Sequence, residues 1–300
     1  MYIEKIDSPA DVKILSVEQM EILAGEIRQA LLHKLSEHGG HIGPNLGMVE
    51  ATIALHYVFS SPHDKIVYDV SHQSYTHKIL TGRKDAFLNA ADYDKVSGYT
   101  NPQESEHDFF TIGHTSTSVS LACGLVKARD LKGGNENIIA VIGDGSLSGG
   151  EAYEGLSNAG EMGTNLIVVV NDNEMSIAEN HGGLYQNLKV LRDSDGKAEC
   201  NFFRALGLDY LYARDGNDVA ALIEVFNRMI TQLKQERSEV REKNHFLDLL
   251  IQASPQGVII LDFDERISEI NPAGLKLLKI EDFSQVKGLS LAEAPCELTR

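Results

Sequence analysis

Residues 143–175 read GDGSLSGGEAYEGLSNAGEMGTNLIVVVNDNEM, and this stretch decides the fold of the first part of the chain. An apolar run at residues 138–142 leads into Gly143-Asp144-Gly145, and a second apolar run at residues 166–170 leads into Asn171-Asp172-Asn173. Two such runs, joined by a helix-compatible segment, predict buried parallel strands with a crossover helix that begins near Gly149. The sequence therefore predicts an α/β fold with a mainly parallel sheet flanked by helices.

Asp144 and Asn173 would follow neighbouring strands of this sheet. In open α/β sheets, ligands bind just past the carboxyl ends of the strands, so we expect the two side chains to lie side by side. A carboxylate and an amide oxygen suit Mg²⁺, and the glycines allow the backbone and a helix N-terminus to approach a diphosphate. An ordinary Gly-Asp turn is the alternative, and the matching NDN after the second strand argues against it.

The paired GDG and NDN motifs resemble the thiamine-diphosphate signature of the transketolase superfamily. The flanking NDNEMSI and the upstream DVSHQSYTHKILTGR (residues 69–83) are similar to the 1-deoxy-D-xylulose-5-phosphate synthase family, and the resemblance extends over residues 10–229. It implies a transferase that joins pyruvate to glyceraldehyde 3-phosphate with loss of CO₂, in the isoprenoid precursor pathway. Thiamine diphosphate and Mg²⁺ are the implied cofactors.

The same resemblance assigns roles to residues of these motifs. It implies that Asp144 and Asn173 bind Mg²⁺ through their side chains and Met175 through its carbonyl, and that His41 and His72 handle protons. The implied cofactor contacts are His72, Gly113, His114, Thr115, Asp144, Gly145, Ser146 and Asn173. The three histidines lie in loops flanked by small residues (GGHIG, VSHQS, IGHTS), and imidazole titrates near neutral pH, which suits proton transfer.

Two further basic side chains follow His72. His77 and Lys78 are candidates for binding a phosphate-bearing substrate, and packing within a helix is the equal alternative. His72 and His77 are five residues apart, which is poor spacing for two zinc ligands on one helical face.

Composition limits the class of protein. The chain has 300 residues, 42% of them hydrophobic, and a net charge of −17, which argues against nucleic-acid and anionic-membrane partners. Three scattered cysteines predict neither a disulfide framework nor a zinc knuckle. The amino terminus lacks an apolar signal core and no run reaches membrane-spanning length, so we expect a cytoplasmic protein. The sequence contains no GxxxxGK[ST], which disfavours a nucleotide triphosphatase.

A long helix is expected from Asp218 onward, with an apolar seam spaced alternately three and four residues apart. Such a heptad seam predicts a parallel two-stranded coiled coil and hence a homodimer, in which polar seam residues fix the register. A single amphipathic helix packed on its own domain is the alternative. The seam residues are Ile223, Phe226, Ile230, Leu233, Arg237, Val240, Asn244, Leu247 and Ile251.

The chain after Ser254-Pro255 has a different pattern. Residues 257–262 and 267–270 read as strands around a turn at Asp264-Glu265, and Pro272 opens a helix. This α+β pattern resembles the opening of a PAS sensor domain and is incomplete. We therefore expect a cofactor-binding domain over residues 1–229, a coiled-coil linker over 230–252 and a partial PAS-like module over 253–300, with two families joined near Met229.

Three functions remain open. The chain can be the diphosphate-binding half of a synthase, inactive alone because the domain that grips the aminopyrimidine ring is missing. It can be a subunit of a split transketolase-like enzyme that pairs with a separate pyrimidine-domain subunit. It can also be a dimeric, PAS-linked sensory protein that only binds the cofactor.

Overall fold

The structure is a computed structural model that describes residues 1–175 and 178–294. The chain divides into two compact units, Met1–Ile230 and Thr231–Arg300. Helix α12 (Val219–Ala253) begins in the first unit and ends in the second. The two units are described separately below.

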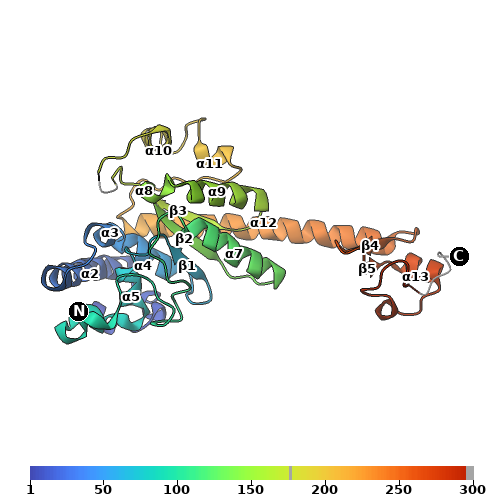
Figure 1. The fold of residues 1–300 in the computed structure, drawn as a ribbon, viewed down its shortest axis with the longest axis horizontal. Helices are drawn as coiled ribbons and strands as arrows, with labels where there is room; N and C mark the ends of the chain where they lie inside the picture. The colour runs from blue at the N-terminus through green and yellow to red at the C-terminus, as the bar shows by residue number, and fades with distance from the viewer. Residues whose placement is uncertain (176–177, 295–300) are drawn as a thin grey trace. The chain divides into compact units, whose positions relative to one another are not determined.

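A parallel sheet forms the centre of the first unit (Figure 1). Its strands are β1 (Lys65–Tyr68), β2 (Ile138–Gly143) and β3 (Ile167–Asn171), in the order β1-β2-β3. Both strand pairs are parallel, and Val141 of β2 is in register with Tyr68 of β1 and Val169 of β3. Every residue of β2 up to Ile142 is buried, as its continuous apolar run requires. The predicted α/β fold with a parallel sheet is confirmed.

Helices surround this sheet, and their ends follow local signals in the sequence. At the start of α2, the Ser16 side chain accepts a hydrogen bond from the Gln19 backbone N–H, and the Gln19 side chain accepts one from the Ser16 backbone N–H. Gly39, with a φ of 80°, ends the helix. The α-helices before α12 are α1 (Pro9–Val12), α2 (Val17–His38), α3 (Gly43–Leu46), α4 (Val49–Val58), α5 (Tyr75–Lys78), α6 (Asp85–Leu88), α7 (Ser118–Leu131), α8 (Asp144–Leu147), α9 (Gly150–Met162), α10 (Gly183–Asp193) and α11 (Phe202–Ala205). Shorter turns are η1 (Ile3–Lys5), η2 (Ile79–Arg83), η3 (Ala90–Lys95) and η4 (Phe283–Gln285).

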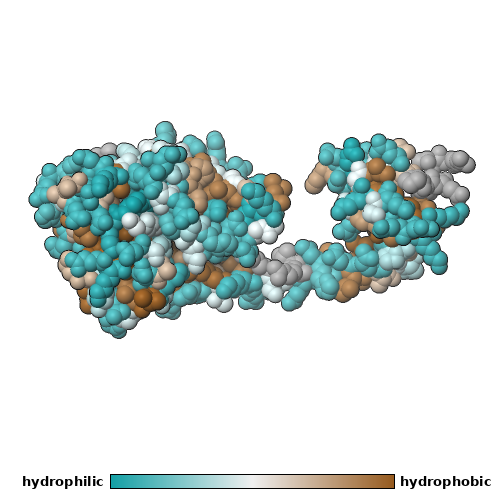
Figure 2. Space-filling view, turned by 90° about the horizontal axis from the view of Figure 1, so that it is seen from below, coloured by the Kyte–Doolittle hydropathy of each residue, from teal (hydrophilic) through white to brown (hydrophobic). Residues whose placement is uncertain are grey.

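Two hydrophobic cores hold the first unit together. One lies between α2 and α4 and includes Leu23, Ile27 and Ile53, and the other joins β2 to α7 and α9. Burial of these apolar side chains is the main force that fixes the helices on the sheet and so places the loops at its carboxyl edge. The surface seen in Figure 2 is largely hydrophilic, in keeping with the charge of −17. Among the described residues, no helix is long and apolar enough to cross a membrane.

Residues 208–212 read as a short strand in the sequence, but they have no regular structure. The described sheet ends at β3, and this segment does not add a strand to that edge. The Tyr210 ring instead stacks on Phe203 at a centroid distance of 5.5 Å. Aromatic packing therefore replaces the expected ladder.

The second unit contains the expected strand–turn–strand–helix pattern. Strands β4 (Ile259–Leu261) and β5 (Ile267–Ile270) are antiparallel, and α13 (Pro272–Leu278) follows. The Asn271 side chain caps α13 by accepting a hydrogen bond from the Gly274 backbone at 2.8 Å. Residues 295–300 of the expected PAS-like module lie outside the described residues.

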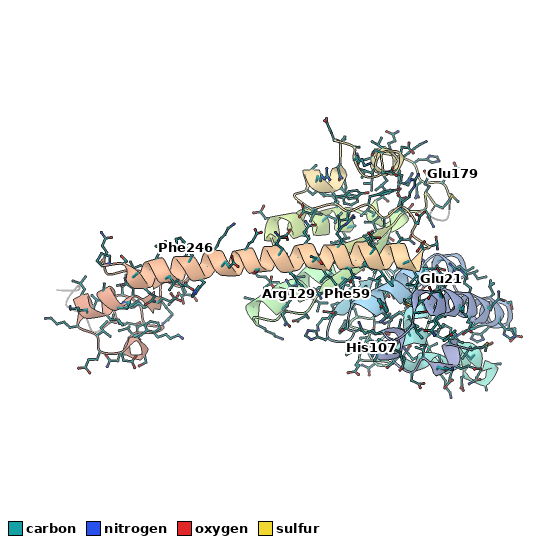
Figure 3. All side chains as sticks on the ribbon, turned by 180° about the vertical axis from the view of Figure 1, so that it is seen from behind. Glu21, Phe59, His107, Arg129, Glu179 and Phe246 are labelled. Carbon is teal, nitrogen blue, oxygen red and sulfur yellow. The ribbon has the colours of Figure 1, made fainter. Side chains whose placement is uncertain are left out.

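The apolar seam of α12 divides into two parts. Leu222 and Phe226 are buried, and Ile223 packs against the core of the first unit, so the start of the helix packs on its own domain. Farther along, the seam residue Leu247 is 53% exposed, and Phe246 beside the seam, labelled in Figure 3, is 59% exposed. The side chains of Arg237 and Val240 lie outside the described residues. The alternative of a single packed helix therefore holds for the first turns of the seam.

Candidate active site

Asp144 and Asn173 lie at the carboxyl ends of two adjacent parallel strands. Asp144 follows β2 directly, and Gly143 is in register with Asn171, the last residue of β3. The backbone N–H of Asn173 is close enough to the Asp144 carboxyl to lower its pKa. The strand order thus brings the GDG and NDN motifs together, as their sequence pattern predicts.

The Asp144 carboxyl is buried, with 3% of its residue surface exposed. Its Oδ1 accepts a hydrogen bond from the Gly145 backbone at 2.8 Å, and its Oδ2 accepts one from Asn180 Nδ2 at 2.9 Å. The pKa of Asp144 is raised to about 6, chiefly by burial and also by the neighbouring Asp172, while the backbone N–H groups of Gly145 and Asn173 act to lower it. A buried, crowded carboxylate of this kind gains free energy from a bound cation.

The chemistry of the three candidate donors suits a magnesium ion. Asn173 and Met175 are exposed at the same strand end, and Asn173 Oδ1 accepts the Met175 backbone N–H at 3.1 Å with one lone pair still free. One carboxylate, one amide oxygen and one backbone carbonyl form a hard oxygen set, which Mg²⁺ completes with water and phosphate oxygens. Within residues 1–175 and 178–294, no group of three or more His, Cys, Asp or Glu side chains is arranged to hold a metal, so a zinc-type site is not formed there.

His41 and His72 form a pair on neighbouring loops. Their ring centroids are 5.3 Å apart and the rings are perpendicular. Burial lowers the pKa of both imidazoles, and for His72 the proximity of His41 lowers it further. Both rings are therefore neutral near pH 7 and able to accept protons. His72 Nδ1 is buried without a partner among the described residues, which leaves it available to a ligand.

The loop that carries His114 lies at the surface. Gly113, His114 and Thr115 are exposed, and His114 Nδ1 donates to the Thr115 carbonyl at 2.7 Å. His114 thus makes a local contact, whereas His41 and His72 contact each other. Ser146 of the GDG loop is joined to this segment, because Ser116 Oγ donates to the Ser146 carbonyl at 2.7 Å. A side chain at Gly149 would meet Ser116 Oγ at 2.0 Å, so only glycine fits beside this contact.

Asp69, at the end of β1, connects the His72 and His114 loops. Its two carboxylate oxygens accept the backbone N–H groups of Ser116 at 2.8 Å and Ser118 at 2.9 Å, at the start of α7. Val70 and Ser71, which follow it, have φ angles of 56° and 69°. A β-branched residue seldom adopts this left-handed conformation, and such strain is found at functional sites whose surroundings impose it. The sequence gives no warning of it, because neither residue is glycine.

Asn45 was not identified from the sequence, although it contacts both histidine loops. It is fully buried, and its Nδ2 donates to the carbonyls of His41 and His72, each at 2.7 Å. Its Oδ1 accepts the Tyr75 backbone N–H at 2.9 Å. One side chain therefore ties three segments together, and the only signal for it in the sequence is its position four residues after His41.

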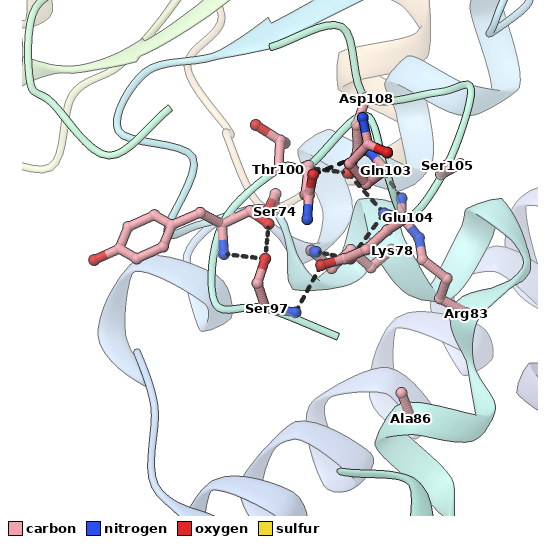
Figure 4. A network of polar contacts seen from close by, with 12 residues as sticks. Ser74, Lys78, Arg83, Ala86, Ser97, Thr100, Gln103, Glu104, Ser105 and Asp108 are labelled. Atoms are coloured by element: carbon pink, nitrogen blue, oxygen red, sulfur yellow. Dashed lines mark hydrogen bonds and ion pairs between the residues drawn. The ribbon is translucent and has the colours of Figure 1, made fainter. Parts of the chain in front are cut away.

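His77 and Lys78, the candidates for phosphate binding, are fully buried and paired within the protein. His77 Nδ1 lies 2.9 Å from His56 Nε2, and His77 Nε2 lies 3.0 Å from Asp108 Oδ1. Lys78 pairs with Glu104, as Figure 4 shows. The packing alternative holds, because neither side chain has exposed surface for a substrate and both already have acidic partners.

The profile of the 1-deoxy-D-xylulose-5-phosphate synthase family matches residues 3–200. The chain belongs to this family. The chain is 43% identical over 263 residues to 1-deoxy-D-xylulose-5-phosphate synthase 2 of Geobacter sulfurreducens, covering 76% of this chain and 42% of that protein. It is 48% identical over 225 residues to the synthase of Listeria monocytogenes, covering 73% of this chain and 37% of that protein. The chain thus spans about two fifths of the length of these relatives.

A solved structure supports the fold assignment of this synthase-family chain. A transketolase from Pichia stipitis superposes with a TM-score of 0.54 at 17% identity, over 71% of this chain and 34% of that chain. At this identity the likeness concerns the fold alone. Members of the synthase and transketolase families are transferases that use thiamine diphosphate with a divalent metal ion.

Proposed function

We propose that this chain is the diphosphate-binding half of a thiamine-diphosphate-dependent 1-deoxy-D-xylulose-5-phosphate synthase. The observation that carries the proposal is the position of Asp144 and Asn173 at the ends of adjacent parallel strands, with a matching set of oxygen donors. Family membership supports it, since these strand ends hold the residues that the sequence motifs single out. The fit of an oxygen-only donor set to Mg²⁺ supports the metal.

Each residue of the site has a distinct part in this proposal. Asp144 and Asn173 bind the divalent ion through their side chains and Met175 through its carbonyl, and Gly145 and Ser146 lie against the diphosphate. His72, Gly113, His114 and Thr115 border the cofactor. Thiamine diphosphate, when bound, supplies the centre that attacks a keto acid and stabilises the resulting negative charge.

His41 and His72 handle protons in this proposal. Their lowered pKa values keep both imidazoles neutral near pH 7, so the pair can donate a hydrogen bond to a substrate oxygen and accept a proton from the substrate. Half-burial on loops held by Asn45 and Asp69 keeps them in place while leaving ring atoms accessible. The substrates we propose are pyruvate and glyceraldehyde 3-phosphate, in isoprenoid precursor synthesis.

We infer that these 300 residues alone bind the cofactor weakly and turn over negligibly. The Gly113 to Thr115 loop and Asn173 are exposed, so the surface that would border the cofactor is open to water. Water at a reacting centre weakens electrostatic stabilisation and competes for reactive species. A pyrimidine-binding domain, on the same or a separate chain, would cover this surface.

Calorimetric titration with thiamine diphosphate and Mg²⁺ tests the proposal. We expect Mg²⁺-dependent binding that is lost in Asp144→Ala, because this removes the only carboxylate of the proposed ligand set. Glu151→Ala is the matched control, since Glu151 is an exposed acid close by on α9, and it should bind as the unaltered chain does. Equal binding by Asp144→Ala and the control would reject the site. Addition of a separately produced pyrimidine-binding domain should then produce turnover.

A second proposed function rests on α12. On its second part the seam residue Leu247 is more than half exposed, and so are Phe246, Leu249 and Leu250 beside the seam. Apolar side chains in a heptad seam gain free energy by packing against a second copy of the helix. We infer that this part dimerises the chain as a coiled coil and that the β4-β5-α13 module serves as a PAS-like sensor. Retention of cofactor binding without any turnover, even with a pyrimidine domain added, would favour this sensory function.

A further inference from the structure

His41 has a hydrogen-bond partner that the proposed mechanism does not use. The Tyr75 hydroxyl lies 3.2 Å from His41 Nδ1 and 3.5 Å from the His41 backbone nitrogen. The backbone N–H can only donate, so the phenol oxygen accepts from it. The phenol hydrogen is then free to be donated to His41 Nδ1.

The surroundings of the hydroxyl favour this direction of donation. Tyr75 is 5% exposed, and burial raises the pKa of its phenol, so the hydroxyl keeps its proton. Among the described residues, His41 Nδ1 is the acceptor within hydrogen-bond distance of this hydroxyl. If Nδ1 carried the imidazole proton instead, the buried hydroxyl hydrogen would lack an acceptor, which is unfavourable.

Close packing fixes the position of the hydroxyl. A Cβ at Gly40 would lie 3.0 Å from the Tyr75 oxygen, and a Cβ at Gly98 would lie 3.3 Å from it and 3.5 Å from His41 Cε1. Gly40 therefore leaves no room for a side chain, and a side chain at Gly98 would press on the phenol. Gly40 also has a φ of +132°, a conformation that side-chain-bearing residues rarely adopt.

Asn45 completes a closed ring of hydrogen bonds. Its side-chain N–H donates to the His41 carbonyl, and its side-chain oxygen accepts the Tyr75 backbone N–H. The contact between the Tyr75 hydroxyl and the His41 ring closes the ring. Tyr75 and His41 are 34 residues apart in the sequence, so this ring of contacts, not local chain geometry, sets their distance. A neutral imidazole has one donor and one acceptor nitrogen, and the partner of one fixes the role of the other.

We propose that Tyr75 is a positioning residue that fixes neutral His41 with its proton on Nε2, and that Asn45 holds Tyr75 in place for this. The inference rests on the proposed function and deepens it, because it makes His41 Nε2 a hydrogen-bond donor toward a substrate oxygen and leaves proton acceptance to His72. It concerns the protein without cofactor, so it is tested independently of catalysis.

Nitrogen NMR of the full chain labelled with ¹⁵N-histidine tests the proposal. The spectrum is recorded above the pH at which histidines titrate, and the His41 signals are identified by comparison with His41→Gln. We expect Nδ1 to give the signal of an acceptor nitrogen and Nε2 that of a protonated one. In Tyr75→Phe the two signals should converge, with the tautomer ratio changing roughly fivefold, about the effect of one neutral hydrogen bond.

Tyr99→Phe is the matched control. The Tyr99 ring also packs against His41, at a centroid distance of 5.4 Å, but its hydroxyl is not bonded to the imidazole nitrogen. The control should leave the His41 signals unchanged. Asn45→Asp should change them as Tyr75→Phe does, because an acceptor would face the His41 and His72 carbonyls.

Two results would overturn the proposal. A protonated Nδ1 on His41 in the unaltered chain would do so, and this result needs no variant to fold. Identical His41 signals in Tyr75→Phe and Tyr99→Phe would also do so. Cofactor titration of the same samples separates this outcome from failure of the proposed function, since a chain can bind no cofactor and still show the predicted tautomer.

Discussion

Asn180 Nδ2 lies 2.9 Å from Asp144 Oδ2 and donates a hydrogen bond to it. The amide therefore holds the carboxylate oxygen that we propose for a divalent cation. Asp144 is buried beside a second carboxylate, Asp172, and its hydrogen-bond donors, Asn180 and the backbone N–H groups of Gly145 and Asn173, are all neutral. Arg192 pairs with Asp172, so Asp144 is the carboxylate without a cationic partner among these groups, which leads to the first prediction.

Mg²⁺ should stabilise the chain more at pH 8 than at pH 5. The pKa of Asp144 is raised to about 6 in the folded protein, above the value of about 3.9 in an unfolded chain. The folded state thus binds this proton more tightly, so the group's contribution to stability is present at acid pH and is lost as pH rises from about 4 to about 6. Above that range a cation can bind the carboxylate in place of the proton. Thermal unfolding with and without Mg²⁺ measures the resulting increase in stability.

Asp144→Asn should remove this response and raise the free energy of unfolding at pH 8 without metal. The expected gain is on the order of 1 kcal/mol, because nearby solvent screens part of the charge. The variant should show the same unfolding midpoint with and without Mg²⁺. An equal Mg²⁺ effect at pH 5 and pH 8 in the unaltered chain would contradict the assignment.

Asp108→Asn should destabilise the first unit by about 3 kcal/mol, the usual result of removing one partner of a buried ion pair. Arg83 donates to both Asp108 oxygens, at 2.7 and 3.0 Å, and His77 approaches at 3.0 Å. Burial raises the pKa of Asp108, but the hydrogen bonds from His77 and Arg83 outweigh it and hold the pKa well below its usual range. Chemical denaturation measures the difference.

This contribution of Asp108 should depend on pH. Because the folded pKa is lowered, the stabilisation is present above about pH 4 and decreases as pH falls through the folded value. The difference in free energy of unfolding between Asp108→Asn and the unaltered chain should therefore become smaller at acid pH. Asp94→Asn is the control, since Asp94 is 92% exposed in its pair with His38 and such surface pairs contribute little.

Two glycine-to-alanine substitutions should have opposite effects. A Cβ at Gly160 in α9 would lie 1.8 Å from the Leu206 carbonyl oxygen, so Gly160→Ala should cost about 1–3 kcal/mol through backbone displacement. Gly124, exposed in the middle of α7, has nothing within 4 Å, so Gly124→Ala should stabilise by about 0.5–1 kcal/mol. Denaturant midpoints of the two variants should move in opposite directions.

Asn244→Leu should raise the stability of the dimer we propose while broadening its oligomeric state. Asn244 is exposed on α12, and in a two-stranded coiled coil a buried asparagine amide pairs with its symmetry mate at some cost in stability. Analytical ultracentrifugation of a peptide spanning residues 218–253, with circular dichroism, measures both. A peptide that is monomeric at tens of micromolar and lacks helix would reject the coiled coil.

Local patterns in the sequence were sufficient to predict much of the secondary structure of the first unit and the position of its candidate metal ligands. The continuous apolar runs predict β2 and β3, because a strand covered on both faces must be apolar throughout. The GDG and NDN motifs place Asp144 and Asn173, since parallel strands carry their carboxyl ends to one edge. The capping box at Ser16 and Gln19 likewise needs only residues three apart.

Only the tertiary structure decided which distant side chains meet. Asn45 is hydrogen-bonded to His72, 27 residues away in the sequence, and His77 to Asp108, 31 residues away. No periodic pattern in the sequence predicts such pairings. The tertiary structure also decided that His77 and Lys78 are packed away from solvent and that Phe226 joins the core of its own domain. The physical reason is that strand and helix patterns depend on near neighbours in the chain. A buried polar contact depends instead on how whole elements pack and on which groups must be paired once water is excluded.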